Sequence, residues 1–400
     1  MDKLNGTIRA YPWGSRTLIP GLRGQEVPSP NPQAELWYGA HPASPSAVSA
    51  TGQPLDAAIA ADPEAHLGSR VRADFGERLP FLLKLLAADE PLSLQAHPSK
   101  AQAEEGFARE NAEGIPLEAP NRNYKDDNHK PELIVALTEF RAMAGFRPLN
   151  RTLELFAALD CPEAERYLAM LDREGAEEAN LRVLFTTWIT IPQAARVALI
   201  EALVERARPL LDREDWIGGV LRTVVDLQER YPGDIGVLGA LLLNHIHLKP
   251  GQAIYLDAGQ LHAYVKGMGV EIMANSDNVL RGGLTSKYVD VPELVRLLTF
   301  SSLAEPTVEC DAQGNYPVPS AEFRLSRHRL APGQDLLLEH DGPAILMCTG
   351  GAVAARPTSG EGTGLALGAR AGDALWLPAC EGPVRVLAEG TEAEVFWARA

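Results

Sequence analysis

The spacing of apolar residues changes twice along this chain, and that change limits the folds open to it. Between residues 150 and 231, apolar residues recur at intervals of three and four, as in Val197, Ile200 and Val204, which is typical of helices. On both sides of this stretch, short apolar runs are separated by Gly and Pro, which is typical of β-strands joined by turns. The pattern therefore predicts a mainly β protein with an α-helical insertion.

The two β-rich regions predict separate units. Residues 1–149 together with 232–305 are expected to form one β-barrel, residues 150–231 the helical insertion, and residues 306–400 a second barrel made of strands and turns alone. Within residues 1–80, frequent Pro, Gly and Asn predict short strands joined by irregular loops. The apolar run FLLKLLAA (81–88) predicts a buried strand, and Ser99 with Gln102 has the spacing of a capping box that begins a helix.

Charge limits the partners of the chain. Its 37 basic and 53 acidic residues give a net charge of −16, which disfavours nucleic acids and anionic membranes because both carry negative charge. No apolar signal-peptide core begins the sequence, and no run approaches the ~18 apolar residues of a membrane span. We therefore expect a cytoplasmic protein that binds neither nucleic acid nor membrane, while the sequence leaves its oligomeric state open.

Four side chains have the chemistry of a divalent-metal site. Gln95 and His97 stand two residues apart, so that on an extended strand both point to the same face. Glu132 and His262 are the other candidate ligands. Two imidazoles, a carboxylate and an amide oxygen suit a borderline ion such as zinc, although an isolated histidine is more often an ordinary polar residue.

The segment PGQAIYLDAGQLHAYV resembles a cupin sequence motif. Its spacing, Gly251-x5-Asp257-Ala-Gly259-x2-His262, is that of the second cupin motif with Asp257 in place of proline. Gln95-Ala-His97 is the counterpart of the His-x-His of the first motif, with the glutamate of that motif displaced to Glu132. His245 and His247 form a competing His-x-His, but no carboxylate lies nearby in sequence, so we interpret them as part of a strand.

Longer strings resemble the type I mannose-6-phosphate isomerase family over about residues 10–300. They include LSLQAHP, NHKPELIVAL, LNHIHLKPGQAIYLDAGQLHAYVKG and GVEIMANSDNVLRGGLTSKYVDV. The resemblance implies a zinc enzyme of the cupin superfamily that interconverts mannose 6-phosphate and fructose 6-phosphate. In that family the metal ligands match Gln95, His97, Glu132 and His262, which implies one zinc per chain, and the catalytic arginine matches Arg281. Residues 306–400 resemble the family more loosely, as a second, non-catalytic cupin-like jelly roll.

The chemistry of an aldose–ketose isomerase points to further residues. The reaction moves a proton between C1 and C2 through an enediol, which needs an acid or base and a positive centre for the oxyanion. Lys130 should share a strand face with Glu132 and supply charge or a proton. Glu271, nine residues past His262 and expected on a neighbouring strand, is the candidate carboxylate base. A structural ion pair is the competing interpretation of Glu271 and Lys130.

Substrate binding in an acidic chain needs a local positive pocket. The candidate phosphate ligands are Arg281, Lys287, Lys130 and Ser93. Trp13 and Tyr264 are candidates for an apolar wall against the sugar, although aromatic residues in a core need no functional explanation.

The C-terminal unit carries a degenerate copy of the metal motif. Gly372-x5-Pro378-x-Cys380 repeats the spacing, but Pro383 stands where the metal histidine belongs, so we expect this barrel to be metal-free. Two other functions remain open: a cupin-type metal dioxygenase, because two His and one carboxylate also suit Fe(II), and a non-catalytic sugar-binding cupin. Gln95 and the cationic residues argue against the first, and an acid–base pair is superfluous in the second.

Overall fold

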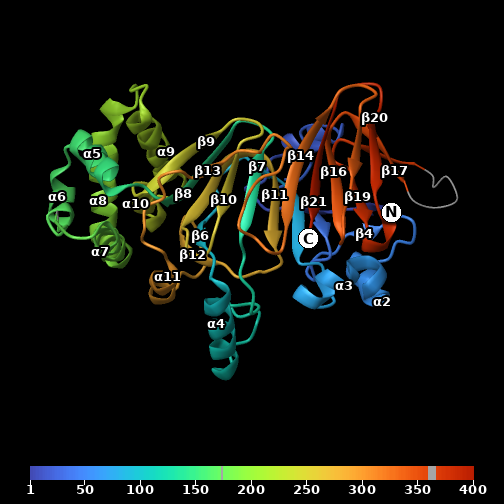
Figure 1. The fold of residues 1–400 in the computed structure, drawn as a ribbon. Helices are drawn as coiled ribbons and strands as arrows, with labels where there is room; N and C mark the ends of the chain where they lie inside the picture. The colour runs from blue at the N-terminus through green and yellow to red at the C-terminus, as the bar shows by residue number, and fades with distance from the viewer. Residues whose placement is uncertain (173, 359–365) are drawn as a thin grey trace.

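Three parts lie in a row in the molecule: helices at one end, a β-barrel in the middle, and a second β-unit at the other end (Figure 1). The computed structural model describes residues 1–172, 174–358 and 366–400. Residues 173 and 359–365, which fall in the predicted helical insertion and second barrel, lie outside the described residues. The predicted fold class, mainly β with an α insertion, is confirmed.

The helical part packs against one outer face of the central barrel. Its apolar stripes, among them Phe156, Leu184 and Trp188, form a buried cluster that continues onto Met143 and Leu243 of the barrel. The helices are α5 (Leu149–Leu159), α6 (Pro162–Leu168), α7 (Glu177–Thr190), α8 (Gln193–Ala207), η1 (Arg208–Leu210), α9 (Trp216–Arg230) and α10 (Ile235–Ala240).

Among the described residues, no single helix is long and apolar enough to cross a membrane. Helix α7 and the segment 193–210 reach the necessary length and apolar composition only together, and a bend of 114° separates them. The apolar residues of both helices belong to the buried cluster shared with the barrel, which accounts for their composition.

The central barrel is built from one continuous network of strands. Its strands are β2 (Thr7–Arg9), β3 (Glu35–Gly39), β5 (Phe81–Ala88), β6 (Leu94–Ala96), β7 (Glu132–Ala136), β8 (Phe140–Phe146), β9 (Leu243–Leu248), β10 (Ala253–Leu256), β11 (His262–Ala274), β12 (Leu280–Gly283) and β13 (Thr307–Val308). As predicted, β5 is buried along its whole length. Helix α4 (Lys100–Ala112) begins at the predicted capping box of Ser99 and Gln102 and projects from the barrel (Figure 1).

Strand β11 joins the two walls of this barrel. Its first half pairs with β6 and β8, and its second half pairs with β5 and β7. The change of partner occurs around Gly267, whose φ of 121° is unfavourable for other residues and where an added Cβ would lie only 2.5 Å from the Glu139 carbonyl oxygen. One strand therefore carries side chains into the interior from both walls.

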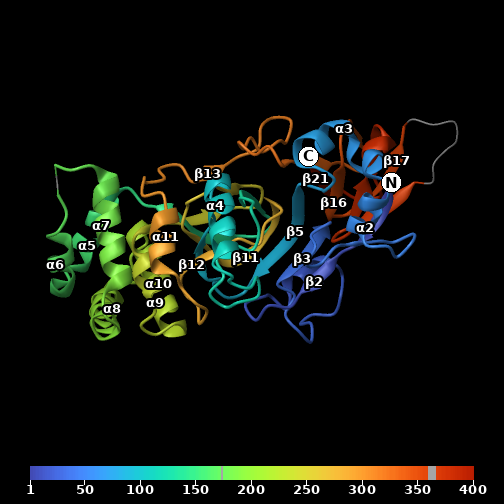
Figure 2. The same cartoon turned by 90° about the horizontal axis from the view of Figure 1, so that it is seen from below.

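The C-terminal unit contains two sheets. The larger sheet has β1 (Asp2–Asn5), β4 (Ala47–Val48), β14 (Arg324–Leu330), β16 (Ala344–Gly350), β19 (Ala374–Leu377) and β21 (Ala393–Arg399). The smaller has β15 (Asp335–Leu338), β17 (Ala352–Pro357), β18 (Leu367–Arg370) and β20 (Val384–Ala388), with η2 (Ala379–Glu381) nearby. Both chain ends lie on this unit (Figures 1 and 2).

The N-terminal segment crosses between the two β-units. Strand β1 pairs with β19, although the sequence places residues 1–149 in the central barrel, and β13 pairs back onto β10. Each of the two β-units thus contains a short strand from the part of the sequence assigned to the other. The division of the chain into domains stays a prediction.

The expectation of strands and loops throughout residues 1–80 is wrong in part. The chain forms α1 (Leu18–Leu22), and then α2 (Leu55–Ala61) and α3 (Pro63–Phe75), which cover the C-terminal unit (Figure 2). Leu55 and Ile59, four residues apart, are buried against it, and Asp62 caps α3 through the Ala65 amide. A final helix, α11 (Val291–Leu297), lies beside β12.

Candidate metal centre and active site

Three predicted metal ligands meet inside the central barrel. His97 directly follows β6, while Glu132 and His262 begin β7 and β11. The distances to the two Glu132 oxygens are 3.4 Å from His97 Nε2 and 3.6 Å from His262 Nε2, and the three ligand atoms lie within 4.8 Å of one another. All three side chains are at most 3% exposed. Segments far apart in sequence thus converge on one point.

Gln95 completes this group. It pairs with His262 across β6 and β11, and its Nε2 atom lies 3.5 Å from His262 Nε2. Rotation of the terminal amide exchanges its oxygen and nitrogen, so the Gln95 side chain can equally present its oxygen to this point. The predicted set of two imidazoles, one carboxylate and one amide is therefore assembled.

The hydrogen bonds of His97 and His262 leave the Nε2 lone pair of each ring free to face the same point. His97 Nδ1 donates to the Asn278 carbonyl at 2.7 Å, and His262 Nδ1 donates to the Gln260 carbonyl at 2.9 Å. This fixes the tautomer that leaves Nε2 free to bind a metal. His97 Nε2 and Glu132 Oε2 are buried without a hydrogen-bond partner among the described residues. Orphaned buried acceptors of this kind are costly unless a cation binds them, so the donor set fits zinc.

The electrostatics of the group favour the protonation states that ligate a metal. Burial first, against the attraction of Glu132, lowers the pKa of His97 to about 4, so its imidazole is neutral. Burial alone would raise the pKa of Glu132, but Lys130 and then His97 hold it well below its usual range. Lys130 Nζ lies 3.1 Å from Glu132 Oε1, so the predicted lysine is adjacent to the metal ligands.

Glu271 lies on the same strand as His262, not on a neighbouring strand as predicted. Strand β11 is 13 residues long because it serves both walls, and it therefore contains both residues. Glu271 Oε1 accepts from the Tyr264 hydroxyl at 2.9 Å, and Oε2 accepts from Lys84 Nζ at 3.0 Å. The ion-pair partner of Glu271 is thus Lys84, and Lys130 pairs with Glu132.

Lys84 was missed by the sequence analysis. It is 5% exposed in the middle of β5. Burial alone would lower its pKa, but Glu271 and then Glu35, whose Oε1 lies 3.8 Å from Lys84 Nζ, raise the pKa above the usual range. Burial first, with Glu132 and Glu35, raises the pKa of Glu271, while Lys84 opposes the rise. The signal was present, because a single lysine inside the buried run FLLKLLAA requires a buried partner.

Arg281 lies beside the metal ligands. On β12 it pairs directly opposite Gln95, it is half-buried, and burial lowers the pKa of its guanidinium. Lys287 is exposed, and Arg281 is the first cause of its lowered pKa, which places the two cations near each other. Ser93 is half-buried and directly precedes β6. Arg281 and Lys287 thus provide positive charge at the edge of the metal centre, and Ser93 adds a hydroxyl group.

Comparison with known proteins decides the family. A family model of the phosphomannose isomerase type I catalytic domain matches residues 1–149. The mannose-6-phosphate isomerase of Escherichia coli K12 is 40% identical over 407 residues, covering 99% of this chain and 99% of that protein. The chain belongs to the mannose-6-phosphate isomerase family. The human mannose-6-phosphate isomerase is 32% identical and covers 89% of each chain.

Solved structures of mannose-6-phosphate isomerases share the whole fold. A mutant of the Salmonella typhimurium phosphomannose isomerase is 36% identical, covers 100% of this chain and 98% of that one, and has a TM-score of 0.87. A zinc-bound holo mannose 6-phosphate isomerase is also 36% identical, covers 99% of this chain and 98% of that one, and has a TM-score of 0.86. The resemblance therefore extends through the C-terminal unit.

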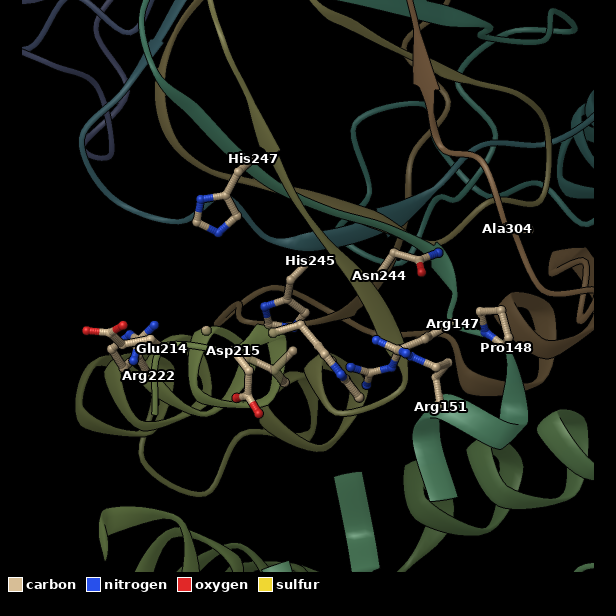
Figure 3. A pocket seen from close by; sticks show the side chains of 13 residues that line it. Arg147, Pro148, Arg151, Glu214, Asp215, Arg222, Asn244, His245, His247 and Ala304 are labelled. Atoms are coloured by element: carbon tan, nitrogen blue, oxygen red, sulfur yellow. The ribbon is translucent and has the colours of Figure 1, made fainter. Parts of the chain in front are cut away.

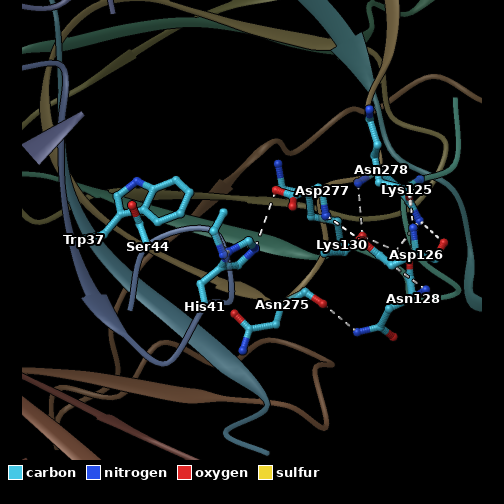
Figure 4. A network of polar contacts seen from close by, with 12 residues as sticks. Trp37, His41, Ser44, Lys125, Asp126, Asn128, Lys130, Asn275, Asp277 and Asn278 are labelled. Carbon is cyan, nitrogen blue, oxygen red and sulfur yellow. Dashed lines mark hydrogen bonds and ion pairs between the residues drawn. The ribbon is translucent and has the colours of Figure 1, made fainter. Parts of the chain in front are cut away.

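A polar network around Asn278, drawn in Figure 4, holds the backbone of that residue in this isomerase. The Asn278 carbonyl in turn orients His97. The fully buried Asn278 side chain donates to the carbonyls of Asp126 and Asn128, both at 2.8 Å, and accepts from the Lys125 amide at 2.7 Å. This network fixes the Asn278 carbonyl that accepts the His97 proton. Asn278 was also missed, although the stretch SDNVLRGGLT drew attention to Arg281 three residues later.

Other side chains border the site or face away from it. The Tyr264 hydroxyl binds Glu271 and its ring packs edge-on against Phe140, while Trp13 packs against the same apolar cluster. His245 and His247 pair with Met143 and Arg141 of β8. In the described residues, the group with metal-ligand geometry is His97, Glu132 and His262.

Proposed function

We propose that the chain is a zinc-dependent isomerase that interconverts mannose 6-phosphate and fructose 6-phosphate. The observation that carries this proposal is the buried His97, Glu132 and His262 group, with Gln95 and Arg281 paired beside it, in a chain of this family. Zinc held by Gln95, His97, Glu132 and His262 would act as a Lewis acid for the sugar oxygens at C1 and C2.

The proton transfer is assigned to Glu271 and Lys130. Burial and its carboxylate neighbours raise the pKa of Glu271, which makes its carboxylate a stronger base than an exposed one. Tyr264 and Lys84 hold this carboxylate in one orientation from both oxygens. Lys130, whose side chain is 11% exposed and lies 3.1 Å from Glu132 Oε1, supplies positive charge or a proton.

Arg281 stabilises the negative charge that develops on the enediolate, and Lys287 binds the phosphate group. Arg281 makes no ion pair with an acidic residue among those described, so its donors are available to substrate. Lys287 and Ser93 extend the positive and polar surface outward, and Tyr264 with Trp13 borders the sugar. A dioxygenase has no need of these cations, and a binding protein has no need of the Glu271 and Lys84 pair beside the metal.

The phosphate requirement gives a first test. With unphosphorylated mannose, kcat/KM should fall at least about a hundredfold, because the remote phosphate holds C1 and C2 against the catalytic groups and each charge-assisted contact contributes roughly tenfold or more. Steady-state kinetics with both sugars measures this ratio.

A matched variant separates phosphate binding from other effects. Lys287→Met should raise KM for mannose 6-phosphate and leave the slow rate with mannose unchanged. Comparable kcat/KM values for the two sugars would contradict the phosphate pocket.

A further inference from the structure

A cavity of about 490 Å³ lies between the outer face of β9 and the helical part (Figure 3). Its lining includes Arg147, Arg151, Arg222, Trp216, His245 and His247. His245 pairs with Met143, whereas the metal ligand His262 pairs with the next residue, Ala144. Because successive side chains on a strand point to opposite faces, the cavity and the metal centre lie on opposite faces of this sheet.

Arg147 is a buried cation without an acidic partner. Its residue is 4% exposed; Nε donates to Thr152 Oγ1 at 3.5 Å, and Nη2 donates to the Leu241 carbonyl. Nη1 is buried and has no hydrogen-bond partner among the described residues. Burial, and then the charge of Arg151, lowers the pKa of Arg147 to about 10, which is the mark of an uncompensated charge. A buried cation left unpaired is costly, and an anion in the cavity would offset that cost.

The guanidinium groups of Arg151 and Arg222 border the same cavity as Arg147. Arg151 lies 4.3 Å and Arg147 5.1 Å from the centre of the Trp216 ring, and Figure 3 shows both side chains reaching toward the same end of the cavity. Arg222 Nη1 donates to the carbonyls of Leu211 at 2.6 Å and Arg213 at 2.8 Å. The helix α9 also begins here, so that the positive end of its dipole adds to the same field.

The carboxylates at this cavity do not neutralise these cations. Asp215 accepts from Arg213 and caps α9 through the Gly218 amide. Glu214 is exposed and forms no ion pair with the three arginines in the described residues. Glu154 lies 3.7 Å from Arg151, and both side chains are about half exposed, so this pair is weak. His245 is neutral, because burial first, and then Arg147, lowers its pKa to about 3.

We propose that this cavity binds the phosphate group of a small phosphate monoester, at a site separate from the metal centre. Guanidinium groups bind phosphate oxygens through paired hydrogen bonds, and a dianion matches two adjacent cations better than a monoanionic carboxylate does. In a chain of net charge −16, only a local cluster of this kind attracts an anion. The volume beyond the arginines accommodates the organic part of the ligand.

Calorimetric titration of the zinc-loaded enzyme with inorganic phosphate and with glycerol 3-phosphate tests the site. Arg151→Met should weaken one binding component roughly tenfold to a hundredfold, because one charge-assisted contact is lost. Arg206→Met, an exposed arginine of α8 away from the cavity, is the matched control and should leave both components unchanged. Arg147→Met should have at least the effect of Arg151→Met, once a thermal melt shows that the variant is folded.

Inhibition kinetics separate this site from the active site. Competitive inhibition of the isomerase by inorganic phosphate should change less than about twofold in Arg151→Met, because the metal centre lies on the other face of the sheet. Titration curves of Arg151→Met that superimpose on those of the unchanged enzyme would overturn the proposal, as would an equal loss of competitive inhibition. A component that binds inorganic phosphate but not glycerol 3-phosphate would overturn the assignment to a monoester.

Discussion

Replacing Glu132 by Gln is expected to remove the bound zinc and the isomerase activity together. Glu132 contributes the carboxylate that both His97 and His262 face, at 3.4 and 3.6 Å, and it is buried where no other acid in the described residues can take its place. The loss should exceed the roughly 10–100-fold typical of residues that only support metal ligands. Metal analysis and a coupled assay on the same preparation measure both quantities.

The unchanged enzyme should hold about one zinc per chain, and His97→Ala should reproduce the effect of Glu132→Gln. Glu139→Gln changes an exposed carboxylate between β7 and β8 and serves as the control, with metal and activity retained. A Glu132→Gln protein that keeps its zinc and its rate would show that the metal is bound elsewhere.

Arg281→Lys should lower kcat and kcat/KM by similar factors, on the order of a hundredfold, with the zinc retained. The guanidinium is half-buried opposite Gln95, so its rigid, planar set of donors is positioned before substrate binds. Lysine keeps the charge but replaces that set with a mobile point charge. Steady-state kinetics with mannose 6-phosphate, together with metal analysis, measures this.

The kinetic pattern distinguishes two roles of Arg281. A rise in KM with unchanged kcat would mean that Arg281 holds the phosphate equally in the ground and transition states. Arg296→Lys, an exposed arginine of α11, is the control and should behave as the unchanged enzyme. An unimpaired Arg281→Lys enzyme would exclude both roles and leave Lys130 and Glu271 as the acid–base candidates.

The metal ligands were predictable because their spacing is local. Gln95 lies in the short strand β6 and His97 directly follows it, while His262 follows a tight turn at Gly259, whose φ is 74°. Glu132 was a candidate by its chemistry and as the displaced glutamate of the first cupin motif, but its place beside the histidines depends on long-range pairing of β7 with β10 and β11. The helical insertion was predictable for a similar reason, because its apolar period differs from that of the flanking strands.

The position of Glu271 was not predictable from local sequence. The length of β11 follows from its pairing with four other strands, and this pairing is a property of the assembled barrel. Helices α2 and α3 were missed because the frequent Pro, Gly and Asn of residues 1–80 were interpreted as signs of loops, whereas Pro63 occupies the first turn of α3, where it needs no amide hydrogen bond.

Conversion of mannose 6-phosphate to fructose 6-phosphate by the purified chain, with and without a chelator, tests the central claim most directly. The enzyme should convert the sugar phosphate without oxygen uptake, lose activity when the metal is removed, and regain it on addition of about one equivalent of zinc per chain. Full activity in the metal-free protein, or no conversion by the zinc-loaded protein, would contradict the assignment of Gln95, His97, Glu132 and His262 to a catalytic zinc site.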